Sequence, residues 1–183
     1  KSLPDLVVVL GDRFEVFSFT QAAFFLKVPI AHIHGGEVTS GAFDDNIRHS
    51  ITKFSNFHFA THNIYKKRLI QLGENPKTIF LVGSPGVENF KKIKLIKKNK
   101  LFKEFSLNKN KKTILVTFHP ETNSNIDYNK QINILLESIR IFKKENFIFT
   151  FNNSDPHGYF FLKKINEYIK TKKNIKIFSS LGA

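Results

Sequence analysis

The sequence predicts an α/β fold built from parallel sheets and divided into two parts. Short apolar runs alternate with stretches of helical periodicity over most of the 183 residues, and this alternation is typical of βαβ units. A polar, lysine-rich stretch interrupts the pattern near residue 100. We therefore expect two parallel-sheet domains, both incomplete in this chain, at residues 1–92 and 113–183, with a connector at residues 93–112.

The first part opens with Leu6–Leu10, whose sequence LVVVL is typical of a strand buried on both faces. Further strands are predicted at Ile30–Ile33, Phe57–Ala60 and Ile79–Val82. The helical patterns between them cover Phe14–Leu26, Asp44–Phe54 and Asn63–Leu72. Asp44 and Asp45 lie in the first turn of the second helix, where the helix dipole stabilises acidic side chains. Gly73 ends the third helix.

The connector carries a helical pattern around Lys94–Phe105, after which the alternation resumes. Strands are predicted at Thr113–Phe118, Phe147–Phe151 and Ile175–Phe178, with helices at Ile126–Lys144 and Gly158–Lys170. Neither part contains a GxGxxG turn or a P-loop, so a glycine-rich phosphate motif of those kinds is not expected.

Composition excludes several classes of function. The chain has no cysteine, which excludes a disulfide framework, a thiolate zinc site and a cysteine nucleophile, and makes the cytoplasm the expected compartment. No apolar run approaches the roughly 20 residues of a membrane-spanning helix. The start KSLPDLVVVLGD does not resemble a secretory signal.

The net charge of +14 suits nucleic acid, a membrane surface or a phosphorylated ligand. However, the arginines that usually recognise phosphate are limited to Arg13, Arg48, Arg68 and Arg140, and lysine dominates. Abundant Lys, Asn, Ile and Phe together indicate the codon bias of an AT-rich genome. We therefore expect no nucleic-acid and no membrane partner.

Two polar clusters follow the first two strands, at the sheet edge where open α/β sheets bind ligands. Gly11 permits a tight turn before Asp12, a candidate acid or base, and Arg13; the alternative is that Asp12 is a helix N-cap. His32 and His34 are two apart, so a strand would point them to the same face, and Glu37 lies beyond Gly35 and Gly36. No further ligand has metal-site spacing, so we expect no metal and assign the glycines to close approach of a ligand.

Two more clusters lie on the second helix and after a strand of the second part. Asp44 and Arg48 are four residues apart, as are Asp45 and His49, so each pair shares a helix face. The alternative is a solvated helix with an ordinary surface ion pair. His119 follows a strand and precedes a proline, which holds it in an extended loop; it either faces a cleft between the domains or is a surface loop residue.

Joined together, these motifs resemble one enzyme family. The stretches GDRFE, IAHIHGGEVTSGAFDDNIRHSITKFS, LGENP, IFLVGSPGVEN and VTFHPET are similar to the UDP-N-acetylglucosamine 2-epimerases, and within them to the hydrolysing branch of sialic- and legionaminic-acid biosynthesis. The resemblance implies a GT-B-like fold with two Rossmann-like domains and an active site in the cleft. It implies a UDP-sugar substrate, no cofactor, and a homodimer or homotetramer of the full-length enzyme.

The implied reaction is elimination of UDP across C1–C2 of the sugar, followed by hydration to the free C2-epimer such as N-acetylmannosamine. By position in the family motif, Asp12 and Asp44 match acids implicated in proton transfer, and Arg48 and His119 match residues that face the substrate and its diphosphate. Arg13, Asp45 and His49 are expected to line the substrate site.

One position departs from the family pattern. Where several relatives carry a glutamate regarded as catalytic, this chain has His34. A histidine also serves as an acid or base near neutral pH, so His34 and Glu37 remain rival candidates for the same role.

Two further interpretations stay open at this point. A GT-B glycosyltransferase shares the expected architecture, although the DDNIRH helix favours the epimerases. A basic module that binds nucleic acid or another polyanion would need lysines on one face and aromatic stacking platforms. The resemblance also places a glycine-containing loop before Lys1 and a uridine-diphosphate loop after Ala183, so this polypeptide by itself is expected to be inactive.

Overall fold

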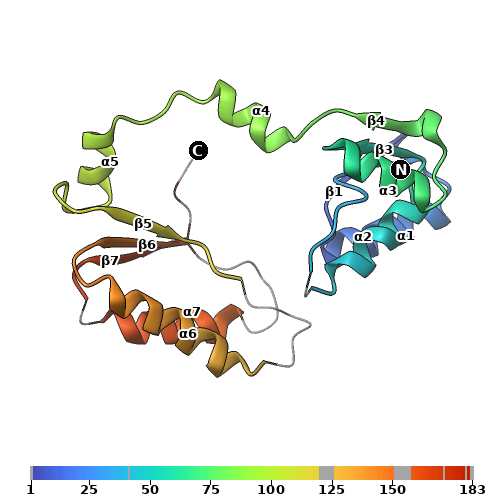
Figure 1. Cartoon of the computed structure of the whole chain (residues 1–183). Helices are drawn as coiled ribbons and strands as arrows, with labels where there is room; N and C mark the ends of the chain where they lie inside the picture. Colours follow the sequence, from blue (N-terminus) through green and yellow to red (C-terminus); the bar gives the residue numbers. More distant parts are fainter. Residues whose placement is uncertain are drawn as a thin grey trace. The chain divides into compact units, whose positions relative to one another are not determined.

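The computed structural model describes residues 2–40, 42–119, 126–150, 158–170, 172–179 and 181. The chain divides into two compact units, residues 1–92 and 93–183, drawn in Figure 1. Each unit has its own parallel sheet and its own hydrophobic core. The predicted α/β fold with parallel sheets is therefore confirmed.

The first unit contains a four-stranded parallel sheet in the order β1-β2-β3-β4. Its strands are β1 (Val7–Leu10), β2 (Ile30–Ile33), β3 (Phe57–Ala60) and β4 (Ile79–Leu81). Its helices are α1 (Phe14–Phe25), α2 (Asp44–Phe54), α3 (Asn63–Gln71) and α4 (Pro85–Lys92), and a 3-10 turn, η1, covers Pro76–Thr78. The bounds of β2, β3 and α2 are those that the sequence predicts.

Helices α1, α2 and α3 cover one face of this sheet. The strand order follows the chain without reversal, so crossovers of one hand place successive helices on the same side. Val7 and Val9 of β1 point into this core, whereas Val8 and Leu10 are 60% and 57% exposed. The prediction that this strand is buried on both faces is therefore wrong, because no described helix covers its second face.

Helix α4 was not predicted. It has Pro85 at its first position, Glu88 in its first turn and lysines in its last turn, all of which favour a helix. None of its residues is buried. The helix is therefore favoured by its local sequence and not by burial in the core.

The second unit contains a three-stranded parallel sheet in the order β5-β6-β7. Its strands are β5 (Thr113–Val116), β6 (Asn146–Thr150) and β7 (Ile175–Phe178), and its helices are α5 (Lys98–Glu104), α6 (Tyr128–Ile141) and α7 (Gly158–Ile169). Helices α6 and α7 pack on β6, where Phe147 and Phe149 are buried. Phe105, directly after α5, is buried with its ring 4.7 Å from that of Phe178. Residues of the lysine-rich stretch thus take part in the packing of this unit.

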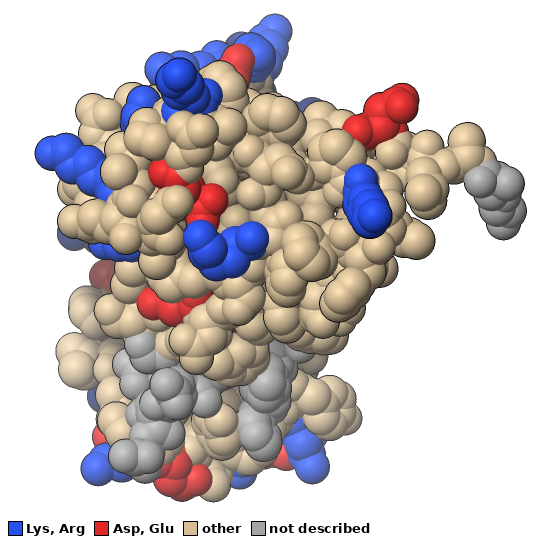
Figure 2. All heavy atoms as spheres, turned by 90° about the vertical axis from the view of Figure 1, so that its right-hand side faces the viewer, with Lys and Arg blue, Asp and Glu red and all other residues tan. Residues whose placement is uncertain are grey.

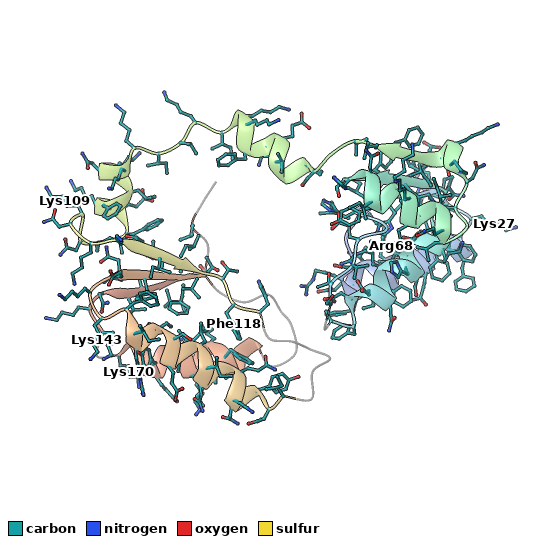
Figure 3. All side chains as sticks on the ribbon, in the orientation of Figure 1. Lys27, Arg68, Lys109, Phe118, Lys143 and Lys170 are labelled. Carbon is teal, nitrogen blue, oxygen red and sulfur yellow. The ribbon has the colours of Figure 1, made fainter. Side chains whose placement is uncertain are left out.

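On the face that Figure 2 shows, basic side chains are separated by acidic and uncharged residues and form no continuous stripe. Lys27, Lys109, Lys143 and Lys170 extend away from the body of their units (Figure 3). Within the described residues, none of the helices combines the length and the apolar character that crossing a bilayer requires.

Candidate active site

The candidate site lies at the carboxyl edge of the first sheet, where parallel sheets commonly bind ligands. β1 ends in a turn at Gly11, whose φ of +77° lies in the left-handed region that favours glycine. The Gly11 N–H donates to the carbonyl of Ile33 at 3.0 Å, which joins the ends of β1 and β2. Asp12 follows this turn directly, and Arg13 is the N-cap residue of α1 without a side-chain cap bond. The alternative interpretation of Asp12 as the helix N-cap is therefore wrong.

The Arg48 guanidinium links the acids of this edge. Its Nη2 donates to Asp12 Oδ2, and its Nη1 donates to Asp45 Oδ1 at 2.7 Å. Nη2 also contacts the Thr39 hydroxyl at 3.0 Å, and the Thr39 backbone N–H donates to Asp45 Oδ1 at 2.7 Å. One arginine on α2 thereby fixes the turn after β1 and the loop that precedes α2.

Arg48 is only 4% exposed, so this network is not a solvated surface ion pair. A guanidinium is stable in such a place because two carboxylates offset the loss of hydration. Removing one partner from a buried pair typically costs about 3–5 kcal/mol of stability, since a charge is left without compensation. The interpretation of α2 as a solvated helix with an ordinary ion pair is therefore wrong for this residue.

His34, Glu37 and Thr61 form a second polar cluster at the same edge. His34 follows β2 with a φ of +68°, which is unusual for a residue with a side chain. Its Nδ1 lies 2.7 Å from Glu37 Oε1, and the Thr61 hydroxyl donates to the same oxygen at 2.7 Å. Thr61 directly follows β3, so three segments of the chain meet here. The side chains of His34 and Glu37 are 27% and 25% exposed, which leaves both accessible to a ligand.

His32 lies beneath both clusters, completely buried. Its Nε2 lies 2.9 Å from the Gly11 carbonyl and its Nδ1 3.2 Å from the Thr52 hydroxyl. A carbonyl only accepts, so Nε2 carries the proton and Nδ1 accepts from Thr52. Burial lowers the pKa of His32 to about 4, against the opposing effect of the Gly11 hydrogen bond and with a smaller contribution in the same direction from Arg48. His32 is therefore neutral at pH 7 and tethers the turn that carries Asp12.

His32 and His34 do not share a face as the strand pattern predicted. β2 ends at Ile33, and the left-handed backbone of His34 breaks the alternation of side chains. His32 is bonded to Thr52 on α2, while His34 turns to Glu37. Gly35 and Gly36 let the chain turn back after His34. Glu37 therefore contacts the His34 ring although two residues separate them.

The glycine pair packs closely against α3. A Cβ atom on Gly36 would lie 2.6 Å from the Tyr65 carbonyl oxygen, and its φ is +78°. A Cβ atom on Gly35 would lie 3.1 Å from His32 Nδ1. Arg68 on α3 (Figure 3) donates from Nη1 to the Gly36 carbonyl at 2.5 Å. These contacts give the glycines a packing role in addition to the expected approach of a ligand.

His49 lies on α2 next to Arg48. Burial lowers its pKa, the charge of Asp45 opposes this shift, and Arg48 and Arg68 reinforce it. Its Nδ1 is buried without a hydrogen-bond partner among the described residues. His49 is therefore held near both arginines as a neutral side chain. Asp44 begins α2 beside Asp45, at the positive end of the helix dipole.

The remaining candidates are more exposed. Arg13 forms an ion pair with Glu15 at 3.2 Å, with a side chain 36% exposed. His119 belongs to the second unit, where it is exposed in the segment after β5. Pro120, which follows it in the sequence motif, lies outside the described residues. The structure thus gathers the candidates of the first unit at one sheet edge and places His119 in the other unit.

Thr39, Thr61 and Arg68 belong to the site but were not recognised from the sequence. Thr61 had a positional signal, because it comes directly after a predicted strand as Asp12 and His34 do. Thr39 and Arg68 had none, since their role depends on contacts across the fold. Among the described residues, no three His, Asp or Glu side chains are grouped as a metal site would require.

Comparisons with known proteins identify the family to which the chain is similar. The profile of the family described as UDP-N-acetylglucosamine 2-epimerase matches residues 1–183. A Campylobacter jejuni relative, GDP/UDP-N,N'-diacetylbacillosamine 2-epimerase (hydrolyzing), is 39% identical over 181 residues, which are 98% of this chain and 47% of the relative. Polysialic acid biosynthesis protein P7 from Escherichia coli is 43% identical over 170 residues, which are 92% of this chain and 43% of that protein.

Solved structures agree on the fold. UDP-GlcNAc 2-epimerase from Neisseria meningitidis, bound to UDP-GlcNAc, matches with a TM-score of 0.76 at 23% identity, over 97% of this chain and 49% of that one. Enzymes of this kind have the GT-B fold, as the sequence motifs implied. The chain spans about half the length of the relatives it matches. Because the family profile matches it from end to end, this chain belongs to the UDP-N-acetylglucosamine 2-epimerase family.

Proposed function

We propose that the protein is a hydrolysing UDP-sugar 2-epimerase. It eliminates UDP from UDP-N-acetylglucosamine or a 2,4-diacetamido analogue, and it then hydrates the resulting glycal. The products are UDP and the free C2-epimer, such as N-acetylmannosamine, which would feed nonulosonic acid biosynthesis. Support comes from relatives at 39% and 43% identity, named as a hydrolysing 2-epimerase and as a polysialic acid biosynthesis protein.

The observation that carries the proposal is the placement of two ionisable side chains, Asp12 and His34, at one sheet edge. Inverting C2 requires that a proton leave one face of the sugar and that another arrive on the opposite face. Asp12, held by Arg48, offers one such group. His34, held by Glu37, offers the other. General acid–base groups of this kind typically contribute about 10²–10⁴-fold each to the rate.

The elimination balances without a cofactor. The base takes the C2 proton, the C2–H electron pair becomes the second C1–C2 bond, and the C1–O pair leaves with UDP. Hydration then adds water, with its oxygen on C1 and a proton on C2. No electron is gained or lost overall, so the reaction requires no redox cofactor.

The departing diphosphate needs cationic or hydrogen-bonding stabilisation. Arg13, which pairs with Glu15, and Arg68, which donates to the Gly36 carbonyl, are the other cationic side chains placed at this edge. We assign them, together with His119 of the second unit, to the diphosphate side of the substrate. Arg48 is instead assigned to orienting Asp12 and Asp45, because its guanidinium already serves both acids.

The biological setting follows from the substrate. Nucleotide sugars are made and used inside the cell, and a chain without cysteine suits a reducing compartment, so we assign the enzyme to the cytoplasm. Family resemblance favours a homodimer or homotetramer of the intact protein. Sedimentation of the natural full-length protein would determine that state.

Product analysis tests the proposal. The natural full-length protein is incubated with UDP-N-acetylglucosamine and, separately, with UDP-N,N'-diacetylbacillosamine, and NMR follows both halves of the substrate. We expect UDP and a free 2-epimeric sugar from at least one of the two. A sugar that changes at C2 but stays attached to UDP would place the protein among the non-hydrolysing epimerases. Transfer that requires an acceptor would identify a GT-B glycosyltransferase instead.

A further inference from the structure

Glu37 and Thr61 are arranged so that together they orient the His34 ring. Glu37 Oε1 lies 2.7 Å from His34 Nδ1 and also accepts the Thr61 hydroxyl at 2.7 Å. We propose that Glu37 and Thr61 are positioning residues that hold His34 in its Nδ1–H tautomer and leave Nε2 as the base that takes the C2 proton. The assignment rests on the proposed epimerase function.

The tautomer follows from the chemistry of the partners. A carboxylate oxygen only accepts hydrogen bonds, so the Nδ1 that faces it must carry the proton when the ring is neutral. The lone pair is then on Nε2, which has no hydrogen-bond partner among the described residues. When Nε2 takes a proton, the adjacent carboxylate stabilises the imidazolium, as in other histidine bases that a carboxylate supports.

Thr61 fixes the carboxylate in its turn. Its hydroxyl comes from the end of β3, 24 residues after Glu37, and it donates to the oxygen that His34 uses. The carboxylate is thereby held from two sides. Without Thr61, Glu37 Oε1 loses one of the two hydrogen bonds that hold it beside the ring.

The backbone around His34 supports the same arrangement. The His34 N–H donates to the Phe59 carbonyl on β3 at 3.2 Å, although the residue has a left-handed φ. Such a conformation typically costs on the order of 1–3 kcal/mol and persists where the surrounding contacts fix it. Arg68 holds the next turn through the Gly36 carbonyl. The ring is therefore oriented by rigid elements and not by a free loop.

This arrangement resolves the rivalry between the two candidates. His34 exchanges the proton with the substrate, and Glu37 acts through His34. The C2 proton moves to Nε2 with no change of electron count, the C2–H pair forms the second C1–C2 bond, and the C1–O pair leaves with UDP. The imidazolium afterwards releases its proton to water.

The first test is spectroscopic and needs no substrate. Long-range ¹H–¹⁵N correlation of histidine in the natural full-length protein distinguishes the two neutral tautomers, and His34→Gln assigns the resonance. We expect His34 with Nδ1 protonated, and we expect Glu37→Gln to raise the Nε2–H population, because an amide can donate to Nδ1. A wild-type His34 with Nε2 protonated would overturn the proposal.

The second test is kinetic, with UDP release as the readout. Thr61→Val removes the hydroxyl at nearly constant shape and should lower kcat about tenfold with KM changed less than about threefold, as expected for one lost hydrogen bond. Thr61→Ser keeps the hydroxyl and should restore kcat to within about twofold. The matched control is Thr78→Val, since within the part of the chain that the structure describes the Thr78 hydroxyl bonds to its own turn, at the Asn75 carbonyl, at 3.0 Å.

The outcomes separate this proposal from the proposed function. If the wild-type protein releases UDP and Thr61→Val retains the kcat of Thr78→Val, the positioning role is wrong and the epimerase assignment stands. If the wild-type protein releases no UDP from either substrate, the assigned function fails, while the tautomer measurement still decides whether the three side chains act as described.

Discussion

Arg48 on α2 donates to the carboxylate of Asp12, which lies 36 residues earlier in the chain, at the turn after β1. This bond joins two motifs that are separate in the sequence, GDR and DDNIRH, into one structural unit. The second carboxylate that Arg48 binds belongs to Asp45, whose Oδ1 lies 2.7 Å from Nη1 of the same guanidinium. The acid proposed for proton transfer is therefore held by a buried cation and not by solvent.

Asp12→Asn tests the role of this acid. The amide keeps the shape of the side chain but cannot exchange a proton, so UDP release should fall by at least about 100-fold. Unfolding free energy should fall by roughly 1–3 kcal/mol, less than for an isolated buried pair, because Asp45 still accompanies Arg48. Asp5→Asn, an exposed site of the same change, is the control. Near-wild-type turnover in Asp12→Asn would remove this residue from the mechanism.

Arg48→Lys tests whether the planar guanidinium matters. A lysine ammonium keeps the charge but cannot serve two carboxylates and the Thr39 hydroxyl in one fixed geometry. We expect a loss of about 2–3 kcal/mol in urea unfolding and a fall in kcat larger than the change in KM. Arg140→Lys, on the exposed side of α6, should change neither. Equal stability of both variants would show that Arg48 is interchangeable with lysine.

Gly36→Ala tests the close packing of the loop on α3. The added Cβ would meet the Tyr65 carbonyl oxygen at 2.6 Å in a left-handed conformation, and this should cost about 2–4 kcal/mol. Gly73→Ala is a matched control, because Gly73 has a φ of +89° but nothing within 4 Å of the added atom. The difference between the two variants isolates the steric clash. Identical losses would mean that α3 moves aside without penalty.

Acid should weaken the fold through His32. The pKa of His32 in the folded protein is about 4, below the ordinary 6.5. Between these two pH values the unfolded chain binds a proton at this histidine and the native state does not. This contribution to stability is complete above pH 6.5 and is lost as the pH falls towards 4. At 1.36 kcal/mol per pKa unit, the loss amounts to roughly 3 kcal/mol.

Burial also lowers the pKa of His58, so its contribution has the same sign and must be separated. Urea titrations from pH 7.5 to 4.5 should therefore show a smaller pH slope in His32→Gln than in the wild type, with His58→Gln as the comparison. A wild-type slope retained in full by His32→Gln would mean that His32 is protonated in the native state.

The sequence predicted most of the fold because parallel strands and their helices leave regular apolar patterns. The bounds of β2, β3, α2 and β7 agree with the predicted ones, since each element has a clear periodicity or a clear end. α4 was not predicted, although Pro85 at its start and the lysines in its last turn are sequence signals for a helix. The burial of β1 on both faces was wrong because the sequence does not reveal which side the helices cover.

The candidate site was predictable in its members but not in its connections. Asp12 and His34 were recognised because they follow strands, where ligands bind. Their partners were not, because a bond such as Thr61 to Glu37 spans separate elements and has no fixed spacing. The left-handed backbone of His34 was not predictable either, because only glycine commonly signals a positive φ in a sequence.

The proposed chemistry at C2 is tested most directly by running the reaction in D₂O. The natural full-length protein is incubated with its UDP-sugar, and NMR examines the released sugar at C2 while UDP is measured in parallel. We predict one deuterium at C2 of a free 2-epimeric sugar for each UDP released, because the proton that leaves one face is replaced from solvent on the other. Free sugar that keeps its original C2 proton and configuration would contradict the account, since UDP would then leave by simple hydrolysis at C1.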